Sequence, residues 1–241
     1  MTDISHLNYL PLALPFFSIL AAIFIVLMAL IELGVLRYAY LALGISSRTA
    51  FLLLLASLLG SYINIPVAQL PAREIVSNEE IWFFGMRYVV PAVTAWPGTV
   101  IAVNLGGAVV PTLLSVYLLG KHRLWGRGLV EILVVAAVCN FLAQPVAGVG
   151  IGIPVFVPPI TAALTASLLS PSLAAPLAYI GGSLGTLIGA DLLNLGKIEG
   201  LGAPVASIGG AGTFDGIFLS GIFAVLIASL SAGPVPRDRA A

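Results

Sequence analysis

Long apolar segments recur along the whole chain, and they limit its fold more than any other feature. A helix needs roughly 20 consecutive apolar residues to cross the bilayer core of about 30 Å. Segments close to that length cover residues 10–33, 49–69, 91–119, 129–149, 153–169, 176–195 and 214–230, with short polar breaks between them. We therefore predict an all-α membrane protein, a bundle of about seven transmembrane helices that forms one polytopic domain over residues 1–241.

The composition supports lipid as the surrounding solvent. Hydrophobic residues make up 60% of the chain and charged residues only 8%, which leaves too little polar surface to cover a water-soluble protein of this size. The formal net charge is zero and no long basic run occurs, so we expect no nucleic-acid partner. Cys139 is the single cysteine, and His6 and His122 lie far apart, so we expect no intrachain disulfide, no metal site and no cofactor.

Prolines and glycines interrupt several of the apolar segments. The fifth segment carries Pro154, Pro158 and Pro159, which remove backbone donors and restrict the residues before them. We expect residues 153–159 to form a broken or re-entrant segment, which leaves open whether residues 153–169 cross the membrane fully.

Loop charges predict the orientation of the chain in the cell membrane, because cytoplasmic loops carry an excess of Lys and Arg. Two connections hold such residues: Arg37 and Arg48 follow the first segment, and Lys121, Arg123 and Arg127 follow the third. We expect both connections and the C-terminus to be cytoplasmic and the N-terminus to be external. Residues 71–88, which include an aromatic cluster, then become an external loop near the lipid headgroups.

Two parts of the chain look alike. Residues 59–66 resemble residues 184–191, and residues 104–108, Asn-Leu-Gly-Gly-Ala, resemble residues 207–211, Ser-Ile-Gly-Gly-Ala. Each part has a helix with a polar or proline break near its outer end, followed by a Gly-Gly break before the next helix.

These matches predict repeat halves over residues 47–120 and 172–231, and coincidence in a Gly- and Ala-rich chain is the alternative. Seven full spans would make the two helical hairpins parallel, whereas a re-entrant fifth segment would make them inverted.

Two aspartates are the strongest candidates for chemistry. An acid inside a membrane span costs roughly 2.5 to 3.5 kcal/mol at the centre, so one that persists normally faces protein or water. Asp191 ends the sixth predicted helix and Asp215 begins the seventh, with a glycine-rich loop between them. The two helices should be antiparallel neighbours, so we expect both carboxyl groups at the external side and close enough to meet. Glu32 and Glu131 lie instead at predicted cytoplasmic helix ends, where a carboxylate can reach water.

Small residues recur every four positions on both of these helices. They are Gly181, Gly185 and Gly189 on the sixth, and Gly216, Ser220, Ala224 and Ala228 on the seventh. Such stripes permit close packing of helices in a membrane. Since Asp191 lies on a different face from Gly189, the sixth helix must either bury two faces as a central helix or unwind at Gly189.

Other polar residues could contribute to a substrate or ion site. Asn64, Asn104, Asn140, Gln144 and Asn194 could either bridge helices or line a polar path. The backbone N–H groups of Gly209, Gly210 and Gly212 precede the seventh helix and could face an anion, but Asp215 beside them favours a cation or proton.

Around the aspartates the chain resembles a family of prokaryotic integral membrane proteins known only as a domain of unknown function. The residues that carry the resemblance are Gly-Thr-Leu-Ile-Gly-Ala-Asp-Leu-Leu-Asn-Leu at 185–195 and Gly-Gly-Ala-Gly-Thr-Phe-Asp-Gly-Ile-Phe at 209–218. The resemblance extends over nearly the whole chain and implies no particular activity.

A second, partial resemblance is chemical. Residues 190–195 and 212–220 are similar to the paired aspartate helices of presenilin-type intramembrane proteases, although Ala190 stands where an aromatic residue is usual and Gly212 lies three residues before Asp215. The resemblance implies that one of Asp191 and Asp215 would be ionised to activate water, while the other would be protonated to polarise the amide.

Three functions remain open on the sequence. The first is a diaspartyl intramembrane hydrolase that acts on a membrane-embedded peptide, with Asp191 and Asp215 as catalytic residues. The second is a transporter or channel for a small cation or solute, built from repeated broken-helix hairpins. The third is a non-catalytic structural or lipid-interacting membrane subunit.

Overall fold

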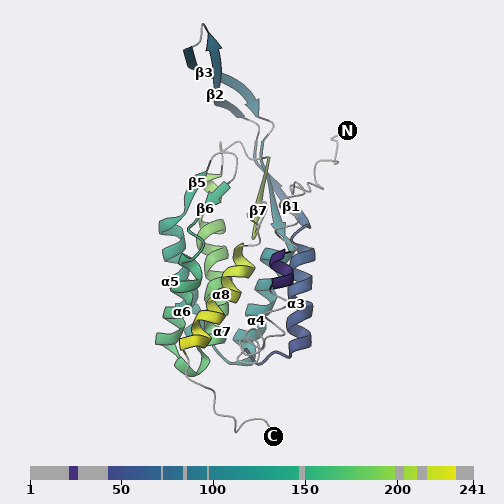
Figure 1. Cartoon of the computed structure of the whole chain (residues 1–241), viewed down its shortest axis with the longest axis vertical. Helices are drawn as coiled ribbons and strands as arrows, with labels where there is room; N and C mark the ends of the chain where they lie inside the picture. The colour runs from purple at the N-terminus through teal and green to yellow at the C-terminus, as the bar shows by residue number, and fades with distance from the viewer. Residues whose placement is uncertain are drawn as a thin grey trace.

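The computed structural model describes residues 22–26, 43–71, 73–83, 86–96, 98–146, 150–198, 204–210 and 216–231. Within them, long helices stand side by side and strands rise from one end of the helices (Figure 1). The separate α-helices are α3 (Ser47–Gly60), α4 (Val110–Lys121), α5 (Trp125–Leu142), α6 (Val157–Leu169), α7 (Ala174–Ile180) and α8 (Gly216–Ser231). Glu32, Gly212 and Asp215 lie outside the described residues.

One helix of 27 residues, Pro171–Lys197, forms the centre of the bundle and is called the central helix below. It is built from η3 (Pro171–Leu173), α7, η4 (Gly181–Gly185), η5 (Leu187–Asp191) and η6 (Leu192–Lys197). The pieces η4 and η5 are π-helical, and η3 and η6 are 3-10 turns. Leu177 and Tyr179 are completely buried, and η4 contacts α4, α5, α6 and α8.

Glycines allow the central helix to pack on two sides. A Cβ atom at Gly185 would lie 2.6 Å from the Cβ atom of Val135, and one at Gly189 would overlap the backbone of α5. Towards α8, a Cβ atom at Gly182 would lie 2.9 Å from the carbonyl oxygen of Ser220. Of the two alternatives given for this helix, a central helix with two buried faces is therefore the one that the structure shows.

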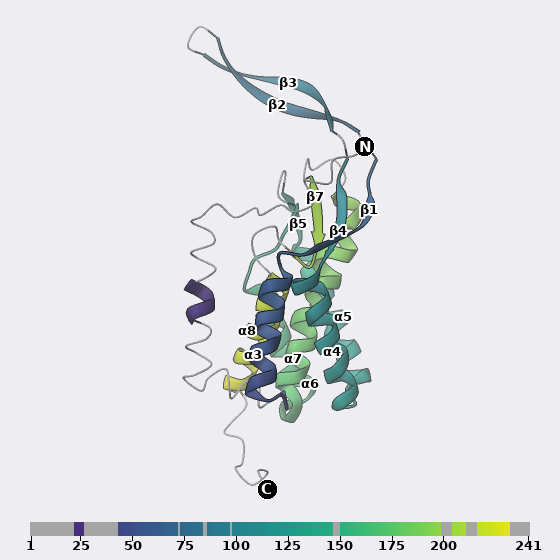
Figure 2. The ribbon, with the colours of Figure 1, turned by 90° about the vertical axis from the view of Figure 1, so that its right-hand side faces the viewer.

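Three small sheets accompany the helices. The largest holds β1 (Asn64–Gln69), β4 (Val100–Asn104) and β7 (Val205–Ile208) in the order β1-β4-β7, with β1 antiparallel and β7 parallel to β4. Between β1 and β4 the chain forms a long antiparallel hairpin of β2 (Arg73–Phe83) and β3 (Met86–Trp96), which projects beyond the bundle (Figure 2). A shorter hairpin, β5 (Gln144–Val146) and β6 (Gly150–Gly152), follows α5.

The strands correct two predictions. The described residues are mostly helical, as predicted, but the fold is not purely α-helical. Residues 71–88 do not form a simple loop, because most of them belong to β2 and β3. The predicted span over residues 91–119 is also wrong in its first part, since the chain is extended to Asn104 and helical only from η2 (Leu105–Val109) onward. Short runs rich in Val and Ile satisfy a hydropathy average whether they form a strand or a helix, which explains the error.

The prolines of the fifth segment start a helix and do not break one. Pro158 and Pro159 occupy the first turn of α6, where the missing N–H groups have no helical partner to lose. α6 then continues without interruption to Leu169. Of the expected broken segment, only residues 153–156 lie outside a helix, between β6 and α6.

Several helices of the bundle are long or apolar, and large apolar side chains are exposed on its outside. Two helices, Trp125–Leu142 and Pro171–Lys197, are long and apolar enough to span a membrane by length and composition. Shorter apolar helices cover Leu105–Lys121, Val157–Leu169 and Gly216–Leu230. Large apolar side chains are exposed on the outside of the bundle: Leu113 and Val116 on α4, Leu129, Leu133 and Phe141 on α5, and Ile160, Leu164 and Leu168 on α6.

The strand–helix units on both sides of the central helix run in the same direction. β4 leads through η2 into α4, β7 precedes α8, and β4 and β7 pair in parallel. Parallel hairpins are the arrangement expected for seven full spans, although the internal repeat itself stays a prediction.

Candidate functional site: a polar junction at the base of the sheet

Asp191 lies where the central helix changes its winding, at the end of η5 and the start of η6. Its Oδ2 atom accepts the backbone N–H of Gly209 at 2.6 Å, in the turn that follows β7. The carboxyl group therefore ties the end of the central helix to the loop that leads toward α8. In the part of the chain that the structure describes, Oδ1 of Asp191 accepts no hydrogen bond.

Gly209 can occupy this turn because it has no side chain. Its φ angle is +87°, in the region that favours glycine, and a Cβ atom there would lie 2.5 Å from the backbone nitrogen of Ala108. The turn therefore packs directly on the backbone of η2. This close approach brings the segment after β7 against η2, the turn that connects β4 to α4.

Asn104 connects the end of β4 to both neighbouring segments. Its Oδ1 atom accepts the backbone N–H of Gly107 at 2.8 Å and so caps η2. Its Nδ2 atom donates to the carbonyl oxygen of Ser61 at 2.8 Å and to Oδ1 of Asn64 at 3.1 Å. These bonds lie at two boundaries between helix and strand, one between α3 and β1 and the other between β4 and η2.

Asn64 and Ser207 complete the group. The hydroxyl of Ser207 donates to Oδ1 of Asn64 at 2.6 Å, so the same oxygen accepts from Asn104 and from Ser207. We call Asn64, Asn104, Asp191, Ser207 and Gly209 the polar junction. It links the first residue of β1, the last residue of β4, the last turn of η5 and the end of β7.

Close contact between α3 and η2 holds the junction from the other side. Ser57 donates through Oγ to the carbonyl oxygen of Gly106 at 2.6 Å. A Cβ atom at Gly60 would lie 2.8 Å from the backbone nitrogen of Gly106, and one at Gly106 would overlap the carbonyl oxygen of Ser57. The two backbones thus approach as closely as small-residue helix packing allows.

The structure brings several of the predicted site residues together and leaves others apart. Asn64, Asn104, Asp191 and Gly209 belong to the junction, and a Cβ atom at Gly210 would lie 2.8 Å from Oγ of Ser207. Asn140 is half-buried on α5 and Gln144 is exposed in β5. Within the described residues, neither of the last two donates or accepts a side-chain hydrogen bond in the junction.

Asn194 supports the helix end next to Asp191. It is completely buried, and its Nδ2 atom donates to the carbonyl oxygens of Gly189 at 2.8 Å and Ala190 at 2.9 Å. These carbonyl groups lie where the winding changes from π to 3-10. The Asn194 side chain donates to them at a point where the regular pattern of helix hydrogen bonds is interrupted.

Sequence reasoning missed Ser207 and misplaced Glu131. Ser207 matches Asn104 in the comparison of residues 104–108 with 207–211, and that match is the signal that could have identified it. Glu131 was expected to reach water at a helix end, but its side chain is 0% exposed. The reason is that α5 begins at Trp125, so Glu131 lies in the second turn and faces the central helix at Gly181.

The described residues contain no group of three or more His, Cys, Asp or Glu side chains that could hold a metal ion. Asp191 accepts the backbone N–H of Gly209. The other hydrogen bonds of the junction join uncharged amide and hydroxyl groups to one another. The chemistry that this arrangement offers is therefore one carboxylate among neutral oxygen and nitrogen groups.

A family model for a protein of unknown function, DUF1614, matches residues 58–227, which is more than half of the chain. The chain belongs to this family. The part that matches the DUF1614 family begins in α3 and ends in α8, so it contains the whole polar junction. No curated protein and no solved structure matches the chain significantly.

Proposed function

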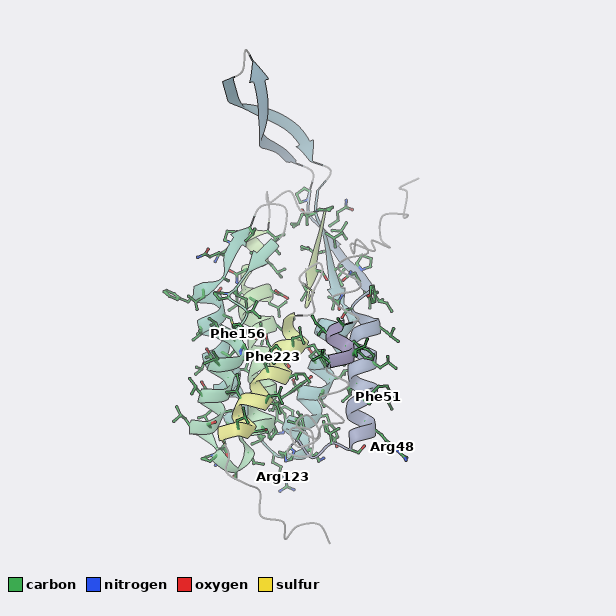
Figure 3. The ribbon with its side chains drawn as sticks, in the orientation of Figure 1. Arg48, Phe51, Arg123, Phe156 and Phe223 are labelled. Carbon is green, nitrogen blue, oxygen red and sulfur yellow. The ribbon has the colours of Figure 1, made fainter. Side chains whose placement is uncertain are left out.

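We propose that the protein crosses a membrane several times, with the bundle in the lipid and the sheet end outside the cell. Support comes from the two helices of spanning length and from the exposed apolar residues on α4, α5 and α6, which suit contact with lipid. Arg48 and Arg123 lie at the end of the bundle opposite the sheet (Figure 3). Basic residues favour the cytoplasmic side, so the β2–β3 hairpin would be external and the C-terminus cytoplasmic.

We further propose that the protein is a carrier or channel for a small cation, with Asp191 as the residue that supplies the negative charge. The observation that carries this proposal is the hydrogen bond between Ser207 and Asn64, because it joins the two predicted repeat halves two residues before Gly209, which binds Asp191. Repeat-built transporters place their sites at the interface of the repeats, where helices are broken. An intramembrane acid is by default a candidate for an ion pathway.

Two features of the junction favour a cation over an anion, and a third is typical of functional sites. The only formal charge among its members is the carboxylate of Asp191, and Gly209 uses only the Oδ2 atom of that group. Oxygen is the ligand type that alkali and alkaline-earth cations prefer. The side-chain oxygens of Asn64 and Asn104 already accept hydrogen bonds inside the junction, so the carboxylate of Asp191 is the group that would meet the cation. Asp191 is also the last residue of the π-helical turn η5, and such turns occur frequently at functional sites.

Ion flux in proteoliposomes tests the carrier function. Purified protein should dissipate an imposed sodium, potassium or proton gradient, and Asp191→Asn should reduce the flux to that of empty liposomes. Asparagine retains an Oδ1 atom that can accept from Gly209, so the variant removes the charge and keeps the hydrogen bond. Glu79→Gln in the β2–β3 hairpin is the matched control and should leave the flux unchanged. Absence of flux with the unaltered protein contradicts the proposal.

A diaspartyl hydrolase is the second candidate, and one contact favours it. Gly209, which donates to Asp191, lies six residues before Asp215 in the chain, so the loop that carries the second aspartate begins at the first. Asp191→Asn and Asp215→Asn should then each abolish cleavage of a membrane-embedded peptide, and the double variant should lose no more than either alone. Flux without cleavage supports the carrier, and cleavage without flux supports the hydrolase. If neither occurs, the protein is a structural or lipid-interacting subunit.

A further inference from the structure

Glu131 is a buried carboxyl group that the polar junction does not use. It is the seventh residue of α5, its side chain is 0% exposed, and neither Oε1 nor Oε2 has a hydrogen-bond partner among the described residues. It faces Gly181 of the central helix, ten residues before Asp191. At about 1.5 Å of helix rise per residue, the two acids lie on the order of 15 Å apart along the bundle.

The space for this carboxyl group exists because residue 181 is a glycine. A Cβ atom at Gly181 would lie 2.5 Å from Oε1, 2.7 Å from Cγ and 3.0 Å from Cδ of Glu131. At the next glycine of the same stripe, Gly185, the neighbour is the apolar side chain of Val135. Of these two glycine positions, Gly181 therefore faces a carboxyl group and Gly185 an apolar side chain.

In the segments that the structure describes, no ion pair neutralises Glu131. α6 and the described part of α8 carry no charged residue, and neither does the central helix from Pro171 to Ala190. On α5, Arg127 lies one turn earlier and donates to Oγ of Ser170 at 3.1 Å. On α4, Lys121 stands at the last residue and donates to the carbonyl oxygen of Gly44. The other buried titratable groups on α5 and α7 are the thiol of Cys139 and the phenol of Tyr179.

An ionised carboxylate in such a place would lack both water and a counter-charge, which costs several kcal/mol even after relaxation. A metal cation would require several oxygen ligands in addition to the carboxylate, and no described polar atom lies within hydrogen-bond distance of Oε1 or Oε2. A proton requires no further ligand. It removes the charge and leaves a neutral acid that fits the space beside Gly181.

We propose that Glu131 is a proton-binding site in the core of the bundle, where Gly181 leaves room for the protonated carboxyl group. The group holds its proton while α5 is packed on the central helix and releases it only when that contact opens to water. This inference goes beyond the carrier function proposed above, because it depends on neither Asp191 nor a transported solute.

Infrared spectroscopy of the full chain in lipid nanodiscs tests the proton directly. The unaltered protein should show the C=O stretching band of a protonated carboxyl group at neutral pH, and Glu131→Gln should remove it while the fold is retained. Asp191→Asn should leave that part of the band in place. A spectrum in which Glu131→Gln removes no protonated-carboxyl signal overturns the proposal. Should Glu131→Gln not fold, the unaltered protein with isotope-labelled glutamate shows whether the protonated carboxyl group belongs to a glutamate, and a band that does not shift with the label overturns the proposal.

A pair of stability measurements tests the position of the carboxyl group. Gly181→Ala should lower the thermal stability, because the new Cβ atom would meet Oε1, and Glu131→Ala in the same chain should restore part of the loss. Gly185→Ala is the matched control, since it meets Val135, and Glu131→Ala should not restore its stability. Equal rescue of both glycine variants, or rescue of neither, overturns the assignment of the carboxyl group to Gly181.

Discussion

The hydroxyl of Ser207 donates a hydrogen bond of 2.6 Å to Oδ1 of Asn64, across 143 residues of sequence. This bond joins β7 to β1, two strands that do not pair with each other but both pair with β4. The same Asn64 oxygen accepts from Asn104 at the end of β4. One side-chain oxygen thus holds three chain segments at the point where strands give way to helices.

We expect Ser207→Ala to lower the free energy of unfolding by about 1 kcal/mol, because a partly buried hydrogen bond is lost while Asn64 retains Asn104 as a partner. Asn64→Leu should cost more, since it leaves Asn104 with fewer partners. A double-mutant cycle in detergent should show coupling between the two changes. Strict additivity would show that the bond contributes nothing to stability.

Gly209→Ala should destabilise the protein by roughly 1 to 3 kcal/mol, because alanine is strained at a positive φ angle and its Cβ atom would meet Ala108. The measurement is thermal unfolding of the purified variant. Gly196→Ala is the control, since nothing lies within 4 Å of a Cβ atom there, and its stability should stay close to that of the unaltered protein. Similar effects at both positions would mean that the close approach at Gly209 is unimportant.

Gly185→Leu should prevent normal folding, because even a Cβ atom at this position would lie 2.6 Å from the Cβ atom of Val135. We expect a low yield and aggregation in size-exclusion chromatography. Gly120→Leu on α4 is the control and should purify normally, since a Cβ atom there meets nothing within 4 Å. A stable, monodisperse Gly185→Leu protein would contradict the packing of the central helix on α5.

The proposed orientation predicts which cysteines an impermeant maleimide can label in whole cells. In a background with Cys139→Ala, a cysteine at Glu79 in the β2–β3 hairpin should react from outside, whereas a cysteine at Lys121 should react only after the membrane is opened. Cys139 itself is completely buried, so its removal serves only to lower the background. Labelling of Lys121→Cys in intact cells would contradict the proposed orientation and indicate the opposite one.

Much of the local organisation followed from the sequence. The apolar content predicted helices that suit a membrane, and the glycine spacing at Gly185 and Gly189 predicted the close packing of the central helix, because small residues at four-residue intervals form one face of a helix. Asn64, Asn104 and Gly209 stand out from the apolar residues around them, and the sequence predicts them as candidate site residues. These features are local, so residue type and spacing suffice to predict them.

Only the tertiary structure decided the remaining features. Hydropathy could not distinguish the strands over residues 91–104 from a helix, because the average over a short apolar run is the same for both, whereas the pairing of β3 with β2 and of β4 with β1 separates them. Glu131 looked like a residue at a helix end, and its burial became evident only once α5 was placed against Gly181. Likewise, Ser207 reaches Asn64 only because β4 lies between their strands. Burial and long-range hydrogen bonds depend on which neighbour faces a side chain, and no property of an isolated segment contains that information.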